Sequence, residues 1–227
     1  MVSARASQTA DFIGRVIMVI YFAFLATIQT MGIIHLFRDD TAAVRFFDLA
    51  PRLANLSFVL LVIAMTVARI KPVRSAEGLE PRFSALIGTC LAGVLTALPL
   101  TDVGPAMEIT ALSMVIVGWM LSAYVLIWLG RAFSIMAQAR RLVTTGPYAI
   151  VRHPLYLCEE IAMIGIALTH WSPEAALIVC VQWLFQLRRM TNEENVLRAT
   201  FPEYAAYAAR TPKVIPRLFP RFSLGHA

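Results

Sequence analysis

Long apolar runs separated by short polar segments dominate the sequence. Four of these runs cover residues 16–37, 53–70, 83–100 and 109–129. Each is close to the roughly 20 residues that a helix needs to cross the hydrocarbon core of a bilayer. The first run is longer than the roughly 7–15 apolar residues of a signal-peptide core and lacks a clear cleavage site. We therefore expect four retained spanning helices.

A fifth apolar region, residues 155–187, is too long for one straight span. The sequence Trp171-Ser172-Pro173 interrupts it. A residue before proline avoids the helical conformation, whereas proline itself suits the first turn of a new helix. We therefore expect a C-terminal helical hairpin, which gives an all-α, polytopic membrane bundle of about six membrane segments.

The helix that starts at Pro173 is expected to continue to about Ala199 and to protrude from the membrane. Such a helix measures roughly 40 Å, whereas the hydrocarbon core is roughly 30 Å thick. Pro202 can start a further short helix, and the prolines at 212 and 216 favour an extended end.

Composition and charge agree with a single membrane domain covering residues 1–227. The chain is 59% hydrophobic and only 15% charged, whereas soluble domains carry about a quarter charged residues. The net charge of +6 does not require a nucleic-acid partner, because lysines and arginines gather in the cytoplasmic loops of membrane proteins. Cys90, Cys158 and Cys180 form no CxxC pair and are expected to be small buried apolar residues.

The loop charges predict that both termini lie on the cytoplasmic side. The turns at 101–108 and 170–173 contain no lysine or arginine, and the 38–52 loop mixes three arginines with three aspartates and is the weak point of this topology. Six spans place the remaining basic segments on the cytoplasmic side, namely 69–82, 130–154 and the tail after 187.

Soluble-type cofactor and metal motifs are absent from the sequence. There is no GxGxxG, GxxxxGK[ST], HExxH or GxSxG, and the four histidines lack metal-ligand spacing. We therefore expect no metal site, and any nucleotide-like cofactor must be held by the membrane helices and their loops.

Polar residues recur on one face of the last long helix. Gln182, Gln186, Arg189 and Glu193 are spaced by four, three and four residues. Polar side chains at membrane depth usually face a bundle interior or a water-filled cavity. Simple alternatives are interhelical hydrogen bonds for the glutamines and an exposed ion pair for Arg189 and Glu193. Glu194 points to a different face and needs a different partner.

The segment before the hairpin also carries candidate chemistry. Gly146-Pro147 reads as a tight turn, and Arg152 and His153 should point in opposite directions along an extended chain. The alternatives are an arginine that reaches lipid phosphates and a structural histidine.

The acids that follow this segment have a simpler interpretation. Tyr156 and Glu160 share a helix face, and Glu159 and Glu160 suit the favourable helix N-terminus at headgroup level.

Four blocks in order, "LVTTGPY", "VRHPLY", "RMTNEENVL" and "FPEYAAYAARTPKVIP", carry a resemblance. They resemble the C-terminal half of the isoprenylcysteine carboxyl methyltransferase family, and the related phospholipid N-methyltransferases share the ending with its paired glutamates. These are integral membrane enzymes that use S-adenosylmethionine. The resemblance covers about residues 130–218 and implies a methyltransferase core there. Residues 1–129 carry no diagnostic motif and are expected to shape substrate access.

The resemblance implies a cofactor pocket at the cytoplasmic membrane face. Arg140 and Cys158 depart from the family pattern, which has a histidine and a glycine at these positions. Carried over residue by residue, the resemblance places Arg152 and Arg189 near the reacting groups, and it nominates for the cofactor Leu142, Val143, Gly146, Tyr148, His153, Pro154, Tyr156, Glu193 and Glu194. We therefore expect catalysis to involve Arg152, Arg189 and Glu193. Gln186, which shares a helix face with Arg189, joins Arg152 and Arg189 as an expected substrate residue.

The chemistry of S-adenosylmethionine suits these residues. Glu193 or Glu194 can accept hydrogen bonds from its ammonium, His153 can donate to its carboxylate, and the Leu142-Val143 edge suits the adenine. An acceptor carboxylate is already ionised and needs only an arginine to orient it. An amine or thiol must lose a proton, which makes a glutamate a candidate base.

We therefore predict S-adenosylmethionine-dependent methyl transfer to a lipophilic, membrane-partitioned substrate, with a carboxylate as the expected acceptor. N-methylation of a phospholipid or lipid amine is the first alternative. A sterol-reductase-like enzyme that uses NADPH is the second, and a non-catalytic membrane protein is the third.

Overall fold

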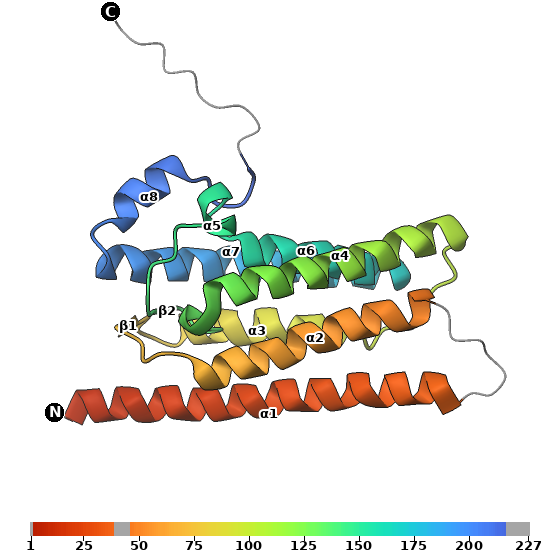
Figure 1. The fold of residues 1–227 in the computed structure, drawn as a ribbon, viewed down its shortest axis with the longest axis horizontal. Coiled ribbons are helices and arrows are strands. Elements are labelled where there is room, and N and C mark those ends of the chain that lie inside the picture. Colours follow the sequence, from red (N-terminus) through yellow and green to blue (C-terminus); the bar gives the residue numbers. More distant parts are fainter. Residues whose placement is uncertain (1, 39–45, 217–227) are drawn as a thin grey trace, which may run out of the picture.

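Six long helices lie along one axis, and two short helices cover one end of them (Figure 1). The computed structural model describes residues 2–38 and 46–216, with side chains described from residue 11 onward. Among these residues, the long helices are α1 (Val2–Arg38), α2 (Phe46–Ala68), α3 (Glu80–Leu95), α4 (Pro105–Leu129), α6 (Pro154–Thr169) and α7 (Pro173–Thr200), and the short ones are α5 (Pro147–Ile150) and α8 (Tyr204–Arg210).

Prolines set several of these helix boundaries. Pro105, Pro147, Pro154 and Pro173 each occupy the first position of a helix, where a missing N–H costs nothing. α3 ends at Leu95, earlier than the apolar run suggests, because Pro99 follows closely. α7 runs to Thr200 and α8 follows, as the sequence predicts.

In the part of the chain that the structure describes, three helices are long and apolar enough to cross a membrane. They cover Asp11–Arg38, Phe46–Ala68 and Pro105–Ala132. The helices α3 and α6 have 16 residues each, and the second half of α7 is charged, so the count of about six membrane segments stays a prediction. Part of the 38–52 loop lies outside the described residues.

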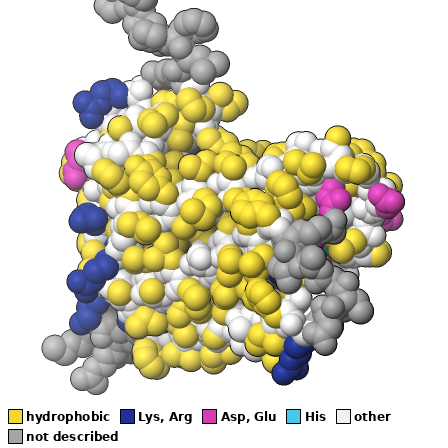
Figure 2. Space-filling view, turned by 45° about the vertical axis from the view of Figure 1, so that its right-hand side comes forward, with side chains coloured by type: hydrophobic (Ala, Val, Ile, Leu, Met, Phe, Trp, Pro, Cys, Tyr) yellow, Lys and Arg dark blue, Asp and Glu magenta, His cyan; other side chains and the backbone are white. Residues whose placement is uncertain are grey.

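The outer surface of the bundle is apolar. Figure 2 shows a flank covered by hydrophobic side chains, with most of the lysines and arginines in view along one edge. On α1, for example, Ile20, Phe24 and Met31 are all more than 60% exposed. Such a surface suits contact with lipid chains. Cys90 and Cys180 are exposed as well, which corrects the expectation that all three cysteines are buried; on lipid-facing helix surfaces a thiol needs no burial.

The inner packing brings helices from both halves of the chain together. α4 packs along both α2 and α6, and α3 packs along α7. Phe58 of α2 stacks on Trp119 of α4 with 4.9 Å between the ring centroids. Small residues let α4 and α6 approach most closely, because Gly118 and Gly165 lie against the partner backbone.

A short sheet is the exception to the all-α prediction. β1 (Arg74–Ser75) pairs antiparallel with β2 (Gln138–Ala139), and two further backbone hydrogen bonds extend the pairing. The sheet ties the segment before α3 to the segment after α4. These two segments therefore form one end of the bundle, together with α5 and α8 (Figure 1).

Alanine at Gly118 or Gly165 should destabilise the bundle. A Cβ at Gly118 would lie 2.5 Å from the backbone nitrogen of Ala162, and one at Gly165 would lie 2.6 Å from the carbonyl oxygen of Ala111. Neither backbone atom can move away without separating α4 from α6, so we expect a loss of about 1–3 kcal/mol. Thermal unfolding in mild detergent measures it.

Gly14→Ala is the matched control, because a Cβ there meets no atom within 4 Å. It should leave the unfolding temperature unchanged or raise it slightly, since alanine favours helix more than glycine does. Equal stability of all three variants and the wild type would contradict the close packing of α4 on α6.

Candidate functional site

One cavity reaches from the apolar helices of the first half into the C-terminal half. Residues of α1, α2, α3 and α4 form one side of it, and the segments around α5, α6 and α7 form the other. Gly146, Pro154 and Glu194 are not among its lining residues. The predicted site residues that line it are Leu142, Val143, Tyr148, Arg152, His153, Tyr156, Gln186, Arg189 and Glu193.

The polar face of α7 points into this cavity, as its spacing predicts. Gln182, Gln186, Arg189 and Glu193 all line it. Both glutamines are 2% exposed and Arg189 is 8% exposed. The alternative of an exposed ion pair between Arg189 and Glu193 is therefore wrong for the arginine, whose guanidinium is inside the protein.

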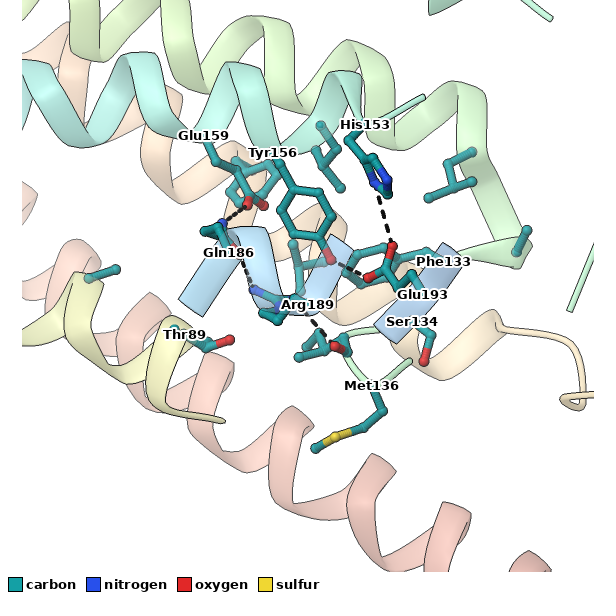
Figure 3. Close-up of a pocket in the computed structure, with 18 of the residues that line it drawn as sticks. Thr89, Phe133, Ser134, Met136, His153, Tyr156, Glu159, Gln186, Arg189 and Glu193 are labelled. Atoms are coloured by element: carbon teal, nitrogen blue, oxygen red, sulfur yellow. Dashed lines mark hydrogen bonds and ion pairs between the residues drawn. The ribbon is translucent and has the colours of Figure 1, made fainter. Parts of the chain in front are cut away.

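A hydrogen-bonded chain connects α6 to α7 across the cavity (Figure 3). The amide of Gln186 donates to Glu159 Oε2 at 3.2 Å and accepts from Arg189 Nη1 at 2.7 Å. Arg189 Nη2 donates to the carbonyl of Ile135 at 3.3 Å, and its guanidinium carbon lies 5.0 Å from the ring centroid of Tyr156. Its Nε is buried without a partner among the described residues. Arg189 is thus held in place with one donor to spare.

Glu193 sits between an aromatic hydroxyl and an imidazole. The hydroxyl of Tyr156 donates to Glu193 Oε1, and His153 Nδ1 lies 3.9 Å from Glu193 Oε2 (Figure 3). Burial raises the pKa of Glu193 above its ordinary value, although His153 and Arg189 oppose the shift. This carboxyl group is therefore easier to protonate than one in water.

Arg152 and His153 converge on one carboxylate, which corrects the expectation that they point in opposite directions. Arg152 Nε and His153 Nε2 each lie 3.0 Å from Glu194 Oε1. The long Arg152 side chain can reach round, and the backbone at His153, with ψ of 58°, is not extended. Burial disfavours the charge of Glu194, but hydrogen bonds from His153 and Arg152 outweigh it and lower its pKa from 4.5 to about 2.

Arg152 also fastens the C-terminal segment. Its Nη1 donates to the carbonyls of Ala208 at 2.8 Å and Thr211 at 2.7 Å. The backbone N–H groups of Arg152 and His153 donate to Pro212 and Lys213. The extended end that the prolines predict is therefore paired with the start of α6. Most N–H groups of the Arg152 side chain donate to other residues of the protein.

The turn before α5 needs glycine. Gly146 has φ of 59°, and a Cβ there would lie 2.2–2.6 Å from the indole of Trp128. This turn starts α5 and buries Tyr148, whose carbonyl accepts a hydrogen bond of 2.7 Å from Tyr207. The turn therefore shapes the wall that carries Leu142 and Val143, although Gly146 itself does not line the cavity.

Glu159 is a cavity residue that the sequence interpretation missed. It lines the cavity together with Tyr156, whereas Glu160 does not, so the inward face of α6 passes through 156 and 159. Glu160 is buried and its Oε2 has no partner among the described residues, so neither acid lies free at headgroup level. The spacing of three between Tyr156 and Glu159 could have found this face.

Unsatisfied polar atoms point to a ligand with charged and apolar parts. Arg189 Nε, Gln182 Oε1 and the Tyr204 hydroxyl belong to lining residues and lack partners among the described residues. Buried polar atoms are normally paired, so these are available to a ligand. Within the described ranges, no group of three or more His, Cys, Asp or Glu is arranged to hold a metal ion.

Comparison with known proteins finds similarity to methyltransferases. Residues 106–204 match the family model described as phospholipid methyltransferase. The chain is 35% identical over 112 residues to protein-S-isoprenylcysteine O-methyltransferase B of Arabidopsis thaliana, covering 46% of this chain and 57% of that protein. It is 31% identical over 116 residues to protein-S-isoprenylcysteine O-methyltransferase of Schizosaccharomyces pombe, covering 48% and 49%.

A further relative carries a different name. The chain is 39% identical over 82 residues to the nickel-cobalt-cadmium resistance protein NccN of Alcaligenes xylosoxydans xylosoxydans, covering 36% of this chain and 38% of that protein. The matches thus span between 38% and 57% of the length of these relatives. The family model and the two methyltransferase relatives thus make the chain similar, over part of its length, to phospholipid and isoprenylcysteine methyltransferases.

Glu194→Gln should destabilise the protein at neutral pH by roughly 1–3 kcal/mol, because a neutral amide replaces the carboxylate that binds Arg152 and His153. The folded-state pKa of Glu194 is about 2 against 4.5 for the free group, so this stabilisation is complete above 4.5 and is lost as the pH falls towards 2. The stability gap between wild type and variant should therefore narrow below pH 4.5. Thermal unfolding from neutral to acid pH measures it.

Glu203→Gln is the control, because Glu203 is an exposed carboxylate at the start of α8. It should leave the stability close to that of the wild type at every pH. A gap for Glu194→Gln that stays constant through the acid range would contradict the low pKa of this carboxyl group.

Proposed function

We propose that this chain, which is similar over part of its length to the phospholipid and isoprenylcysteine methyltransferases, is a membrane enzyme that transfers a methyl group from S-adenosylmethionine to a lipophilic acceptor. One observation carries the proposal. Segments around α5, α6 and α7, which contain the family-like sequence blocks, contribute polar side chains to one cavity that the apolar N-terminal helices complete. A polar reaction centre beside an apolar channel is what such a transfer requires.

The cavity residues fit the parts of S-adenosylmethionine. Glu193 is suited to accept hydrogen bonds from the ammonium of the cofactor. His153, which lies beside Glu193, is suited to donate to the carboxylate of the cofactor. Leu142 and Val143 offer an apolar edge to the adenine, and Tyr148 and Tyr156 complete the wall. When bound, this cofactor supplies an electrophilic methyl group on a sulfonium. We propose that Gly146, Pro154 and Glu194 shape the wall of the cavity, because they do not line the cavity themselves.

Arg189 is the residue that we propose to orient the acceptor. It is buried and fixed by Gln186, and its Nε has no partner among the described residues. A guanidinium in this position can hold a carboxylate, which is already ionised and needs no general base. Methyl transfer is an in-line displacement, so correct placement supplies much of the rate. Arg152, which the sequence also nominates, is a positioning residue in this proposal, because its donors hold Glu194 and the C-terminal segment.

An amine acceptor is the alternative, and the match to the phospholipid methyltransferase model favours it. An amine must lose a proton, and a carboxylate whose pKa is raised is a better proton acceptor near neutral pH than an ordinary one. Burial raises the pKa of Glu193, which makes this residue the candidate base.

We further propose six membrane segments, with both termini and the cavity mouth on the cytoplasmic side. The support is the charge at the end formed by β1, β2 and α8, where Lys71, Arg74, Arg198 and Arg210 are exposed. A reporter fused after residue 227 should be active only in the cytoplasm, and export of that reporter would contradict the proposed orientation.

Binding of S-adenosylhomocysteine tests the proposed function. In lipid nanodiscs, calorimetry should detect binding by the wild type, and Glu193→Gln should weaken it by about 10–100-fold, because a charged hydrogen bond is lost. Glu174→Gln, an exposed acid at the start of α7, is the control and should bind like the wild type. No binding by folded wild-type protein would reject the methyltransferase and favour a reductase or a non-catalytic protein.

The labelled product separates the two acceptor classes. With tritiated methyl donor and a lipid extract as acceptor, a methyl ester should release its label as methanol in mild alkali, whereas an N-methyl group should retain it. Arg189→Gln should lower the rate of ester formation by about 10–100-fold and leave S-adenosylhomocysteine binding within a factor of a few. Alkali-stable label would reject the carboxylate acceptor in favour of the amine.

A further inference from the structure

A second group of charged side chains surrounds Asp11, which lies in the N-terminal part of α1. The carboxylate of Asp11 lies 3.6 Å from Arg15, 3.0 Å from Arg69 and 3.3 Å from Arg140. Three guanidinium groups thus share one carboxylate, and the described residues contribute no other acid to this group of ion pairs. This group, which we call the Asp11 cluster, has a local excess of positive charge.

Arg140 is the most enclosed member of the cluster. It is 4% exposed, and burial lowers its pKa to about 10. Its Nη2 donates to Gln138 Oε1 at 2.6 Å and to Asp11, but Nε and Nη1 have no partner among the described residues. Buried donors of a charged group are rarely left unpaired, because the loss of water is costly.

Gln138 fixes the position of this guanidinium. Its side-chain oxygen accepts from Arg140 and, at 2.8 Å, from Ser134. Its side-chain nitrogen donates to Asp11 at 3.0 Å and to Ser75 at 3.1 Å. Because Gln138 lies in strand β2, Arg140 is held by a hydrogen bond to a residue of the sheet and not to a flexible loop.

Arg140 lines the same cavity as Arg189, on the side of the N-terminal helices. Gln138, Tyr21 and Phe58 line it as well, so apolar side chains of α1 and α2 share the cavity with this charge. Ser134 and Met136 also line it, and Figure 3 shows Met136 pointing from that segment towards α1. A ligand that carries an anionic group and an apolar tail matches this pairing of features.

We propose that Arg140 is an anion-binding residue of the cavity and takes a carboxylate or phosphate group of a ligand whose remaining part lies in the same cavity. The source of that anionic group rests on the proposed function: the group belongs either to the head group of a lipophilic acceptor or to the amino-acid end of the cofactor, as its carboxylate. Asp11 then has a defined role, since it holds Arg140 and offsets part of its charge.

Anion-dependent binding in zwitterionic nanodiscs tests the proposal. The probes are dodecanoate and dodecyl phosphate against uncharged dodecanol, and S-adenosylhomocysteine against methylthioadenosine, which lacks the amino-acid end. Arg140→Gln should weaken binding of the anionic probe of at least one pair by about tenfold or more, and leave its uncharged partner unchanged. Lys71→Gln, which removes an exposed charge from the same end of the bundle, should bind every probe as the wild type does.

The pair that responds identifies the source of the anion. Loss with the dodecyl probes assigns Arg140 to the acceptor, and loss with S-adenosylhomocysteine assigns it to the cofactor. Wild-type protein that fails to bind S-adenosylhomocysteine but binds dodecanoate through Arg140 would reject the proposed function and keep this inference. A folded Arg140→Gln variant that binds all probes like the wild type overturns it.

Asp11→Asn should change the binding of the anionic probes in the opposite direction, which a merely structural effect would not do. Removing the carboxylate raises the net positive charge around Arg140, so the anionic probes should bind more tightly by a few-fold. If Arg140→Gln does not fold, Asp11→Asn alone tests the proposal. Binding that weakens or stays the same in folded Asp11→Asn protein overturns the proposal.

Discussion

The carboxylate of Glu194 joins segments that lie far apart in the sequence, and the shape of the cavity depends on it. It accepts from Arg152 and His153 at the start of α6, while Arg152 also holds the carbonyls that follow α8. Loss of this carboxylate would leave Arg152 Nε and His153 Nε2 without their shared acceptor, which is unfavourable at a buried position. One turn of α7 therefore fixes both His153 and the C-terminal segment beside the cavity.

The neighbouring polar chain has a different character. Glu159, Gln186 and Arg189 connect α6 to α7, but they leave polar atoms without partners. A network kept only for stability would be expected to satisfy its members, because each unpaired buried atom is unfavourable. The structure therefore contains a closed network around Glu194 that supports the wall, and an open one around Arg189 that is available to a ligand.

Two arginines of the cavity lining have donors without partners among the described residues. Arg189 belongs to α7 and donates to the carbonyl of Ile135, whereas Arg140 is held by Asp11 and Gln138 beside the N-terminal helices. Glu159 and Glu193 supply negative charge on the C-terminal side. A ligand that carries both signs of charge, together with a second ligand that has an anionic head, matches this distribution. The apolar first half thus supplies lining residues to the cavity as well as a surface suited to membrane contact.

The sequence determined the features that follow from spacing within one element. Prolines set the starts of α6 and α7, and the recurrence of Gln182, Gln186, Arg189 and Glu193 gave their common inward face. Only the tertiary structure decided which groups meet across elements. The convergence of Arg152 and His153, the inward turn of Glu159 and the burial of Arg140 beside Asp11 depend on packing partners up to 129 residues away, which local periodicity does not encode.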